Sequence, residues 1–141
     1  MSSFDSPDRS PALWNPSAAA GWSLVFTPAF GAYLHARNAA VLGRVEEAKA
    51  NRIWFQVSLG YQVFVCASIF IPSIPEPVFR GAVVGLLLGW YVSVGRKQVV
   101  YVKGTYSADY HRRSWTKPLV IACSALILFL IVGWGLLLLQ E

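Results

Sequence analysis

The side chains that could carry out acid–base or metal chemistry in this sequence are few and far apart. Asp109 and His111 place a carboxyl group and an imidazole two residues apart, and such a pair does acid–base work only beside a substrate cleft. The other imidazole, His35, lies near Asn38, and two separated histidines with one nearby acid make a poor set of metal ligands. We therefore expect no enzyme activity, no metal site and no cofactor.

Other chemical motifs are equally scarce. Cys66 and Cys123 stand alone within apolar runs, which indicates buried thiols that act as small apolar side chains. The sequence has no phosphate-binding loop, no G-x-S-x-G motif and no H-E-x-x-H motif. Gln62 falls near the middle of an apolar run, so its amide is expected to bond to a neighbouring helix or else to contact a substrate or ion.

The composition is typical of a membrane protein. Hydrophobic residues make up 55% of the 141 residues and charged residues only 13%, whereas soluble domains carry about 25% charged residues. The net charge of +5 arises from Lys and Arg in short segments between apolar runs. In that position they act as topology determinants and contacts to lipid headgroups, so we expect no nucleic-acid binding.

The distribution of apolar residues predicts an all-α fold, a polytopic membrane helical bundle. It would have three full transmembrane helices plus a kinked or re-entrant N-terminal one. Residues 1–13 are rich in Ser, Asp and Pro and are predicted to form a flexible arm before a single membrane domain, 14–141. The predicted spans are about 17–34, 53–71, 78–95 and 118–139, with basic connectors at 35–52 and 96–117.

The first apolar run is the least certain to cross a membrane. Its helix should begin at Asn15 and Pro16, because Asn is a good N-cap and Pro suits the first helical position. Pro28 then interrupts this short run, so it either crosses as a kinked helix, with Thr27 helping to satisfy the backbone, or enters and returns. We expect the full crossing, which places the N-terminus outside; a re-entrant segment would leave it inside.

The third run carries small residues at regular spacing. Gly81, Gly85, Gly89 and Ser93 lie four residues apart and therefore share one stripe of a helix. In a membrane such a stripe lets a second helix approach closely. The stripe serves either packing within the bundle or dimerisation between copies.

Both ends of this glycine-bearing helix have sequence signals. The proline-rich segment 72–77 cannot continue a helix, so it predicts a tight turn and an antiparallel hairpin between the second and third runs. Trp90 and Tyr91 are expected near the opposite membrane interface.

The two connectors hold most of the basic residues and predict the orientation. The first is expected to be a short amphipathic helix on the membrane surface or a solvated helical loop. The positive-inside rule places both connectors in the cytoplasm, with the proline turn and the C-terminus on the periplasmic side. The residues of the second connector expected to contact anionic lipid headgroups are Arg96, Lys97, Lys103, Arg112, Arg113 and Lys117.

The block at 14–34 reads WNPSAAAGWSLVFTPAFGAYL and is followed by Asn38 and by Leu42 and Gly43. It resembles a family of small uncharacterised bacterial inner-membrane proteins, in which a W-N block with F-x-P-x-F opens two or more hydrophobic helices. The resemblance implies a bacterial inner-membrane setting, and it assigns no activity and no functional residue.

These observations predict a small multi-pass protein of the inner (cytoplasmic) membrane that acts by helix–helix or loop-mediated interaction. Its partners would be anionic lipids and a second copy or another membrane protein. One concrete form is immunity-type protection against a pore-forming toxin, whose helices would dock on the glycine stripe. The alternative is an oligomeric small-solute transporter or channel component, with Gln62 and Ser68 lining the path.

Overall fold

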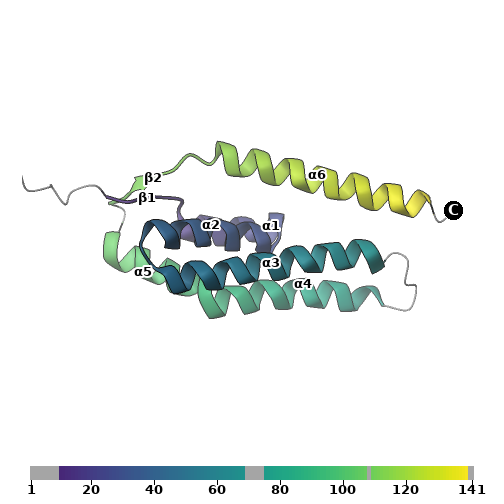
Figure 1. Ribbon diagram of the computed structural model, residues 1–141, viewed down its shortest axis with the longest axis horizontal. Coiled ribbons are helices and arrows are strands. Elements are labelled where there is room, and N and C mark those ends of the chain that lie inside the picture. The colour runs from purple at the N-terminus through teal and green to yellow at the C-terminus, as the bar shows by residue number, and fades with distance from the viewer. Residues whose placement is uncertain (1–9, 69–74, 108, 140–141) are drawn as a thin grey trace, which may run out of the picture.

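A computed structural model of the chain describes residues 10–68, 75–107 and 109–139, and most of these are helical, so the all-α prediction is confirmed. Helices α3, α4 and α6 run along the long direction of the molecule (Figure 1). The elements are β1 (Ala12–Leu13), α1 (Pro16–Phe26), α2 (Pro28–Val41), α3 (Val45–Ser68), α4 (Glu76–Trp90), a π-helical segment (Tyr91–Gly95), α5 (Arg96–Tyr106), β2 (His111–Arg112) and α6 (Thr116–Leu138).

Helices α1 and α2 form an antiparallel hairpin, because the chain reverses direction at Thr27. Thr27 has φ 79° and ψ 161°, and Pro28 after it disfavours the helical conformation at this position. Gly31, four residues after the turn, lies against Ser23, four residues before it. The predicted full crossing by 17–34 is therefore wrong. Each helix, at about 16 and 21 Å, is also shorter than the roughly 30 Å hydrocarbon core.

The first basic connector is not a separate surface helix. Its first part belongs to α2 and its last part to α3, and a short turn at 42–44 joins them. Gly43 has a positive φ of 69°, a conformation that glycine adopts without steric cost. At the start of α3, Arg44 pairs with Glu47 at 2.5 Å. The guanidinium of Arg44 also lies 4.0 Å from the ring centroid of Tyr101 in α5, so the two connectors touch.

The glycine-bearing helix is longer than predicted. It continues from α4 through the π-helical segment into α5 and ends at Tyr106, not near residue 95. Trp90 is fully buried rather than at an interface. Its indole N–H donates to Asn51 Oδ1 at 2.9 Å. Its ring packs edge-on against the His35 ring, with 5.1 Å between the ring centroids. Burial is possible because the indole finds a hydrogen-bond acceptor inside the bundle.

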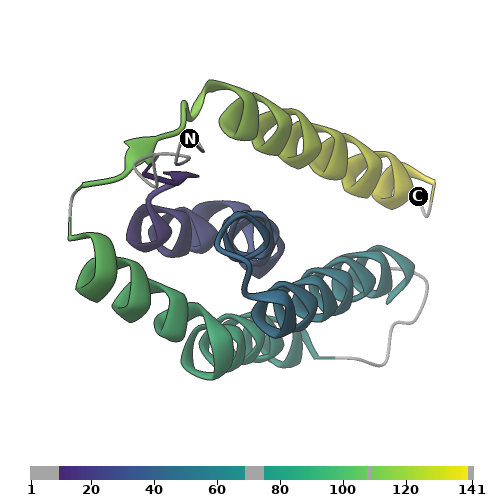
Figure 2. The same ribbon diagram turned by 60° about the vertical axis from the view of Figure 1, so that its left-hand side comes forward.

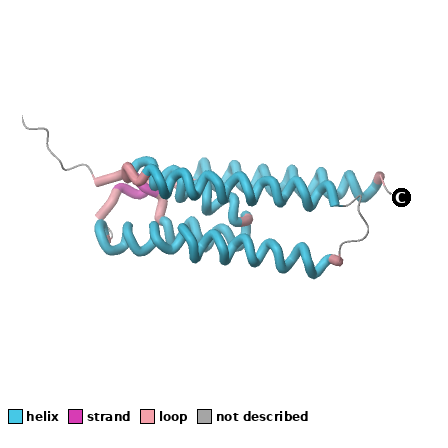
Figure 3. The backbone as a smooth tube through the Cα atoms, turned by 60° about the horizontal axis from the view of Figure 1, so that its bottom comes forward, coloured by secondary structure: helices cyan, strands magenta, loops and turns pink. Residues whose placement is uncertain are grey.

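The N-terminal strand β1 pairs in parallel with β2, with Ala12 opposite His111, at one end of the molecule (Figure 3). Leu13 is fully buried, so the predicted flexible arm extends too far along the chain. Residues 1–9 of that arm lie outside the described residues, as does the first half of the predicted proline turn, 72–74. Tyr61 of α3 donates its hydroxyl to Phe79 O of α4 at 2.7 Å, beside that turn.

Two helices are long and apolar enough to cross a membrane. They are Pro77–Tyr106, with 30 residues, and Thr116–Leu138, with 23. None of the described residues of α6 is buried, and α6 lies apart from the other helices in two views (Figures 1 and 2). By length and composition the described residues therefore contain two such helices, so the three full spans that the sequence predicts are not confirmed.

Candidate functional site

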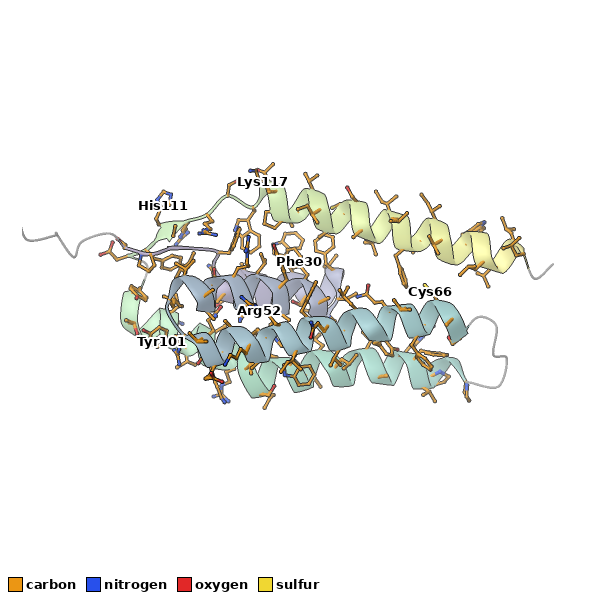
Figure 4. The ribbon with its side chains drawn as sticks, in the orientation of Figure 1. Phe30, Arg52, Cys66, Tyr101, His111 and Lys117 are labelled. Atoms are coloured by element: carbon orange, nitrogen blue, oxygen red, sulfur yellow. The ribbon has the colours of Figure 1, made fainter. Side chains whose placement is uncertain are left out.

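A cavity of about 610 Å³ lies between α6 and the other helices, and we call it the lateral cavity. Its walls come from the α1–α2 turn, α3, α4 and α6. Phe30 of α2 points into the space below α6 (Figure 4). The volume is that of a small-molecule or lipid-chain site. Typical wall residues are Phe30, Phe55, Leu59, Val83, Ala122 and Leu126.

Few polar groups reach the wall of the lateral cavity. Gln62 donates its amide N–H to Thr27 Oγ1 at 2.8 Å, which ties α3 to the α1–α2 turn. Ser58 is buried, and its hydroxyl has no hydrogen-bond partner among the described residues. Ser68, the other residue of the predicted solute path, is not part of this wall and donates to Val65 O at 2.7 Å. The cavity is thus suited to an apolar ligand.

The glycine stripe is covered only at one end. At Gly89 an added Cβ would lie 3.1 Å from the Trp54 ring of α3, so this glycine packs within the bundle. The Ser93 hydroxyl donates to Gly89 O at 2.6 Å, within its own helix. At Gly81 and Gly85 an added Cβ would meet no described atom within 4 Å.

The uncovered glycines belong to an apolar surface of α4. By helical spacing, Gly81 and Gly85 share one side of α4 with three exposed apolar residues. We call this surface the glycine face; it consists of Val78, Gly81, Val84, Gly85 and Leu88. No described part of the chain covers Gly81 and Gly85, so a close approach there is open to another molecule.

The predicted headgroup contacts lie on α5, on β2 and the residue after it, and at the start of α6. Helix α5 and strand β2 are at one end of the molecule (Figure 1). Five of the six are exposed, and Arg113 is partly buried because its guanidinium lies 4.7 Å from the ring centroid of Trp14. The Trp14 indole N–H also donates to Ser114 O at 3.0 Å. Contacts from the N-terminal segment therefore brace the second connector.

A buried polar cluster, which the sequence did not predict, joins the same end of the bundle. Asn38 Nδ2 donates to Trp14 O at 2.7 Å, and its Oδ1 accepts the Trp14 backbone N–H at 3.1 Å. Gln98 donates to His35 O at 2.8 Å. His35 Nε2 lies 3.0 Å from Pro16 O and donates to it, because a carbonyl can only accept. The cluster holds the α1–α2 hairpin against α5.

His35 is a structural group in this arrangement. Burial lowers its pKa to about 4, although the hydrogen bond to Pro16 O opposes the shift. The ring is therefore neutral at physiological pH, and its Nδ1 has no hydrogen-bond partner among the described residues. A group so enclosed has no route to a substrate.

The acid–imidazole pair and the cysteines are not brought together. Asp109 and His111 are both exposed near the paired strands and line neither the lateral cavity nor a smaller hollow of about 180 Å³ near Tyr110. Cys66 and Cys123 form no disulfide; Cys123 is exposed, in contrast to its predicted burial, and Cys66 is partly buried. Within the described part of the chain, no three His, Cys, Asp or Glu side chains cluster as metal ligands.

The buried amides Asn38, Asn51 and Gln98 carried no signal in the sequence that marks them as buried. Asn38, Asn51 and Gln98 are uncharged polar residues on otherwise mixed helical segments, and nothing local distinguishes them from exposed residues. Their partners lie 24 to 63 residues away along the chain.

Comparison of the chain with protein-family models, curated proteins and solved structures finds no match.

Proposed function

We propose that this chain is a multi-pass integral membrane protein that acts by non-covalent packing within the bilayer and catalyses no reaction. Two long apolar helices and the exposed apolar surface of α6 support the membrane location. In lipid such exposure carries no hydrophobic penalty, whereas in water it would favour aggregation.

In this proposal α3, α4 with the π-helical segment that follows it, and α6 cross the inner membrane. The α1–α2 hairpin enters from the cytoplasmic side and returns, because both of its ends lie near the basic connectors. The N-terminal segment and the basic connectors are then cytoplasmic, and the C-terminus is periplasmic.

Labelling of single cysteines in intact cells and in opened membranes tests this topology. Lys103→Cys and Ser10→Cys should both be protected from an impermeant thiol reagent in intact cells, and Ser73→Cys should react. Labelling of Ser10→Cys from outside would support a full crossing by 17–34. Labelling of Lys103→Cys and Ser73→Cys from the same side would overturn the membrane topology as a whole. The two native cysteines are replaced by serine in the background chain.

The observation that carries the functional proposal is that no described atom covers Gly81 and Gly85. A helix of a partner membrane protein or of a second copy can approach these two glycines closely enough for dispersion contacts and Cα–H···O bonds. Immunity-type protection is one form of this activity, with a helix of a pore-forming toxin as the partner.

Isoleucine substitutions at the glycine face test the proposal. Gly81→Ile with Gly85→Ile should abolish cross-linking of α4 to its partner helix in native membranes. Gly60→Ile in α3 is the matched control, because an added Cβ there also meets no described atom within 4 Å. Unchanged cross-linking in the double variant would refute the role of the glycine face. The transporter alternative has its own assay, solute uptake into proteoliposomes.

A further inference from the structure

We infer that the lateral cavity binds one acyl chain of a glycerophospholipid whose phosphate group lies at Arg80. This inference deepens the proposed function and rests on the membrane location, because it names a ligand for the space under α6. The lateral cavity is a different surface from the glycine face, so this inference can fail while the proposed role of the glycine face stands.

The shape of the lateral cavity fits a chain-like ligand. On α6 its wall extends from Pro118 to Phe129, and on α3 from Phe55 to Val65. At a rise of 1.5 Å per residue, these walls run for about 16 and 15 Å along the helices. The cavity is therefore elongated along the direction in which acyl chains lie in a bilayer.

The mostly apolar wall favours a hydrocarbon ligand over ordered water in the lateral cavity. A buried water needs two to four polar partners, and most of the wall consists of aromatic and aliphatic side chains. Aromatic rings from five helices, among them Phe30, Phe55 and Phe129, supply dispersion contacts to a hydrocarbon chain. The surrounding bilayer provides such chains at high concentration.

Two polar groups in the wall match the polar part of a phospholipid. Arg80 is the charged residue among the described lining residues, and it is exposed. A guanidinium has five N–H donors, so it can bind a phosphate and keep its contacts within the protein. The buried Ser58 hydroxyl, which lacks a partner among the described residues, can donate to an ester carbonyl.

Native mass spectrometry of the full-length chain in detergent micelles tests this inference, with added palmitoyl-oleoyl phosphatidylglycerol as the probe. We expect one lipid per chain at saturation. Ala122→Phe and Ala125→Phe place a ring in the cavity and should each weaken binding at least tenfold. Ser124→Phe is the matched control, because Ser124 is exposed on α6 and does not line the cavity.

The contact between Arg80 and the phosphate is tested separately, with two further variants and a lipid that lacks the phosphate. Arg80→Gln should weaken phosphatidylglycerol binding several-fold and leave the weaker binding of a diacylglycerol with the same chains unchanged. Arg52→Gln, at an exposed position outside the cavity, is the control. Equal effects of Arg80→Gln and Arg52→Gln would overturn the phosphate assignment.

Three results would overturn the inference as a whole. The first is equal lipid binding by Ala122→Phe, Ala125→Phe and Ser124→Phe. The second is a continuous series of lipid adducts in place of one bound lipid, and the third is a dimer of the parent chain that only the two cavity variants lose. Circular dichroism shows whether each variant keeps its helices, and two independent cavity variants guard against a folding defect in one. Cysteine labelling of the same chains separates a failure of this inference from a failure of the membrane topology.

Discussion

Replacing Gly31 by alanine is expected to destabilise the chain, because the α1–α2 hairpin packs directly on Trp90. A Cβ at Gly31 would lie 2.1 Å from Ser23 Oγ and 2.4 Å from Trp90 Cη2. The indole cannot easily move away, because it is fully buried and bonded to Asn51. Overpacking of a well-packed core costs about 1–3 kcal/mol, and two overlaps this close place the cost near the upper end, about 3 kcal/mol.

Gly21 in α1 provides a matched control. It also lies inside a helix, but an added Cβ there would meet no described atom within 4 Å. Gly21→Ala should therefore stabilise the chain by up to about 1 kcal/mol through helix propensity alone. The same gain applies to Gly31→Ala, so the difference between the two variants isolates the steric cost. That difference corresponds to a midpoint shift of the order of 10 °C.

Thermal unfolding in detergent micelles, followed by circular dichroism, measures both variants. Gly31→Ala should unfold well below the parent chain and Gly21→Ala at or slightly above it. Adding Trp90→Phe to Gly31→Ala should recover part of the loss, because phenylalanine lacks the overlapping atom, and the cycle gives the coupling energy. Equal midpoints for Gly31→Ala and Gly21→Ala would refute the hairpin packing described here.

Three further predictions concern the polar end of the bundle. The low pKa of His35, about 4, means that between pH 6.5 and 4 the unfolded chain binds a proton that the folded chain does not. The free energy of unfolding should therefore fall by up to about 3 kcal/mol as the pH drops through this range. His35→Gln should flatten that part of the pH profile, and a profile identical to the parent's would contradict the buried neutral ring. Gln98→Ala should cost about 1–3 kcal/mol in denaturant unfolding, because it removes the hydrogen bond to His35 O and truncates a fully buried side chain. A loss no larger than that of the exposed Lys97→Ala would count against the cluster. Arg44→Gln and Tyr101→Leu should each cost about 1 kcal/mol, because each removes the same cation–π contact. Their costs should therefore be non-additive in a double-mutant cycle. Simple additivity would show that the two connectors do not touch.

The first apolar run shows where sequence reasoning stops. Pro28 signals an interruption, but whether the chain kinks or reverses depends on the backbone angles of Thr27. Those angles carry a conformational cost of about 1–3 kcal/mol for a residue other than glycine. They persist because distant groups, Gln62 and Trp90 among them, hold the turn and the hairpin in place. Such contacts have no local signature.

The burial of Trp90 is a second feature that local sequence could not predict. A tryptophan near the end of an apolar run is expected at an interface. Its burial depends on Asn51, which is 39 residues away and supplies the acceptor for the indole N–H. Sequence spacing along one helix cannot reveal an acceptor on another helix.

The sequence by itself determined the helical fold class, the apolar runs, the concentration of basic residues in two segments and the alignment of Gly81, Gly85 and Gly89 on one helix. These features follow from composition and helical periodicity, which are local properties of the chain. Only the tertiary structure decided that 17–34 reverses, that Gly89 is covered while Gly81 and Gly85 are open, and that a cavity lies under α6. The reason is physical: each of these depends on which surfaces meet across long stretches of chain, and packing selects among arrangements that local sequence leaves equal.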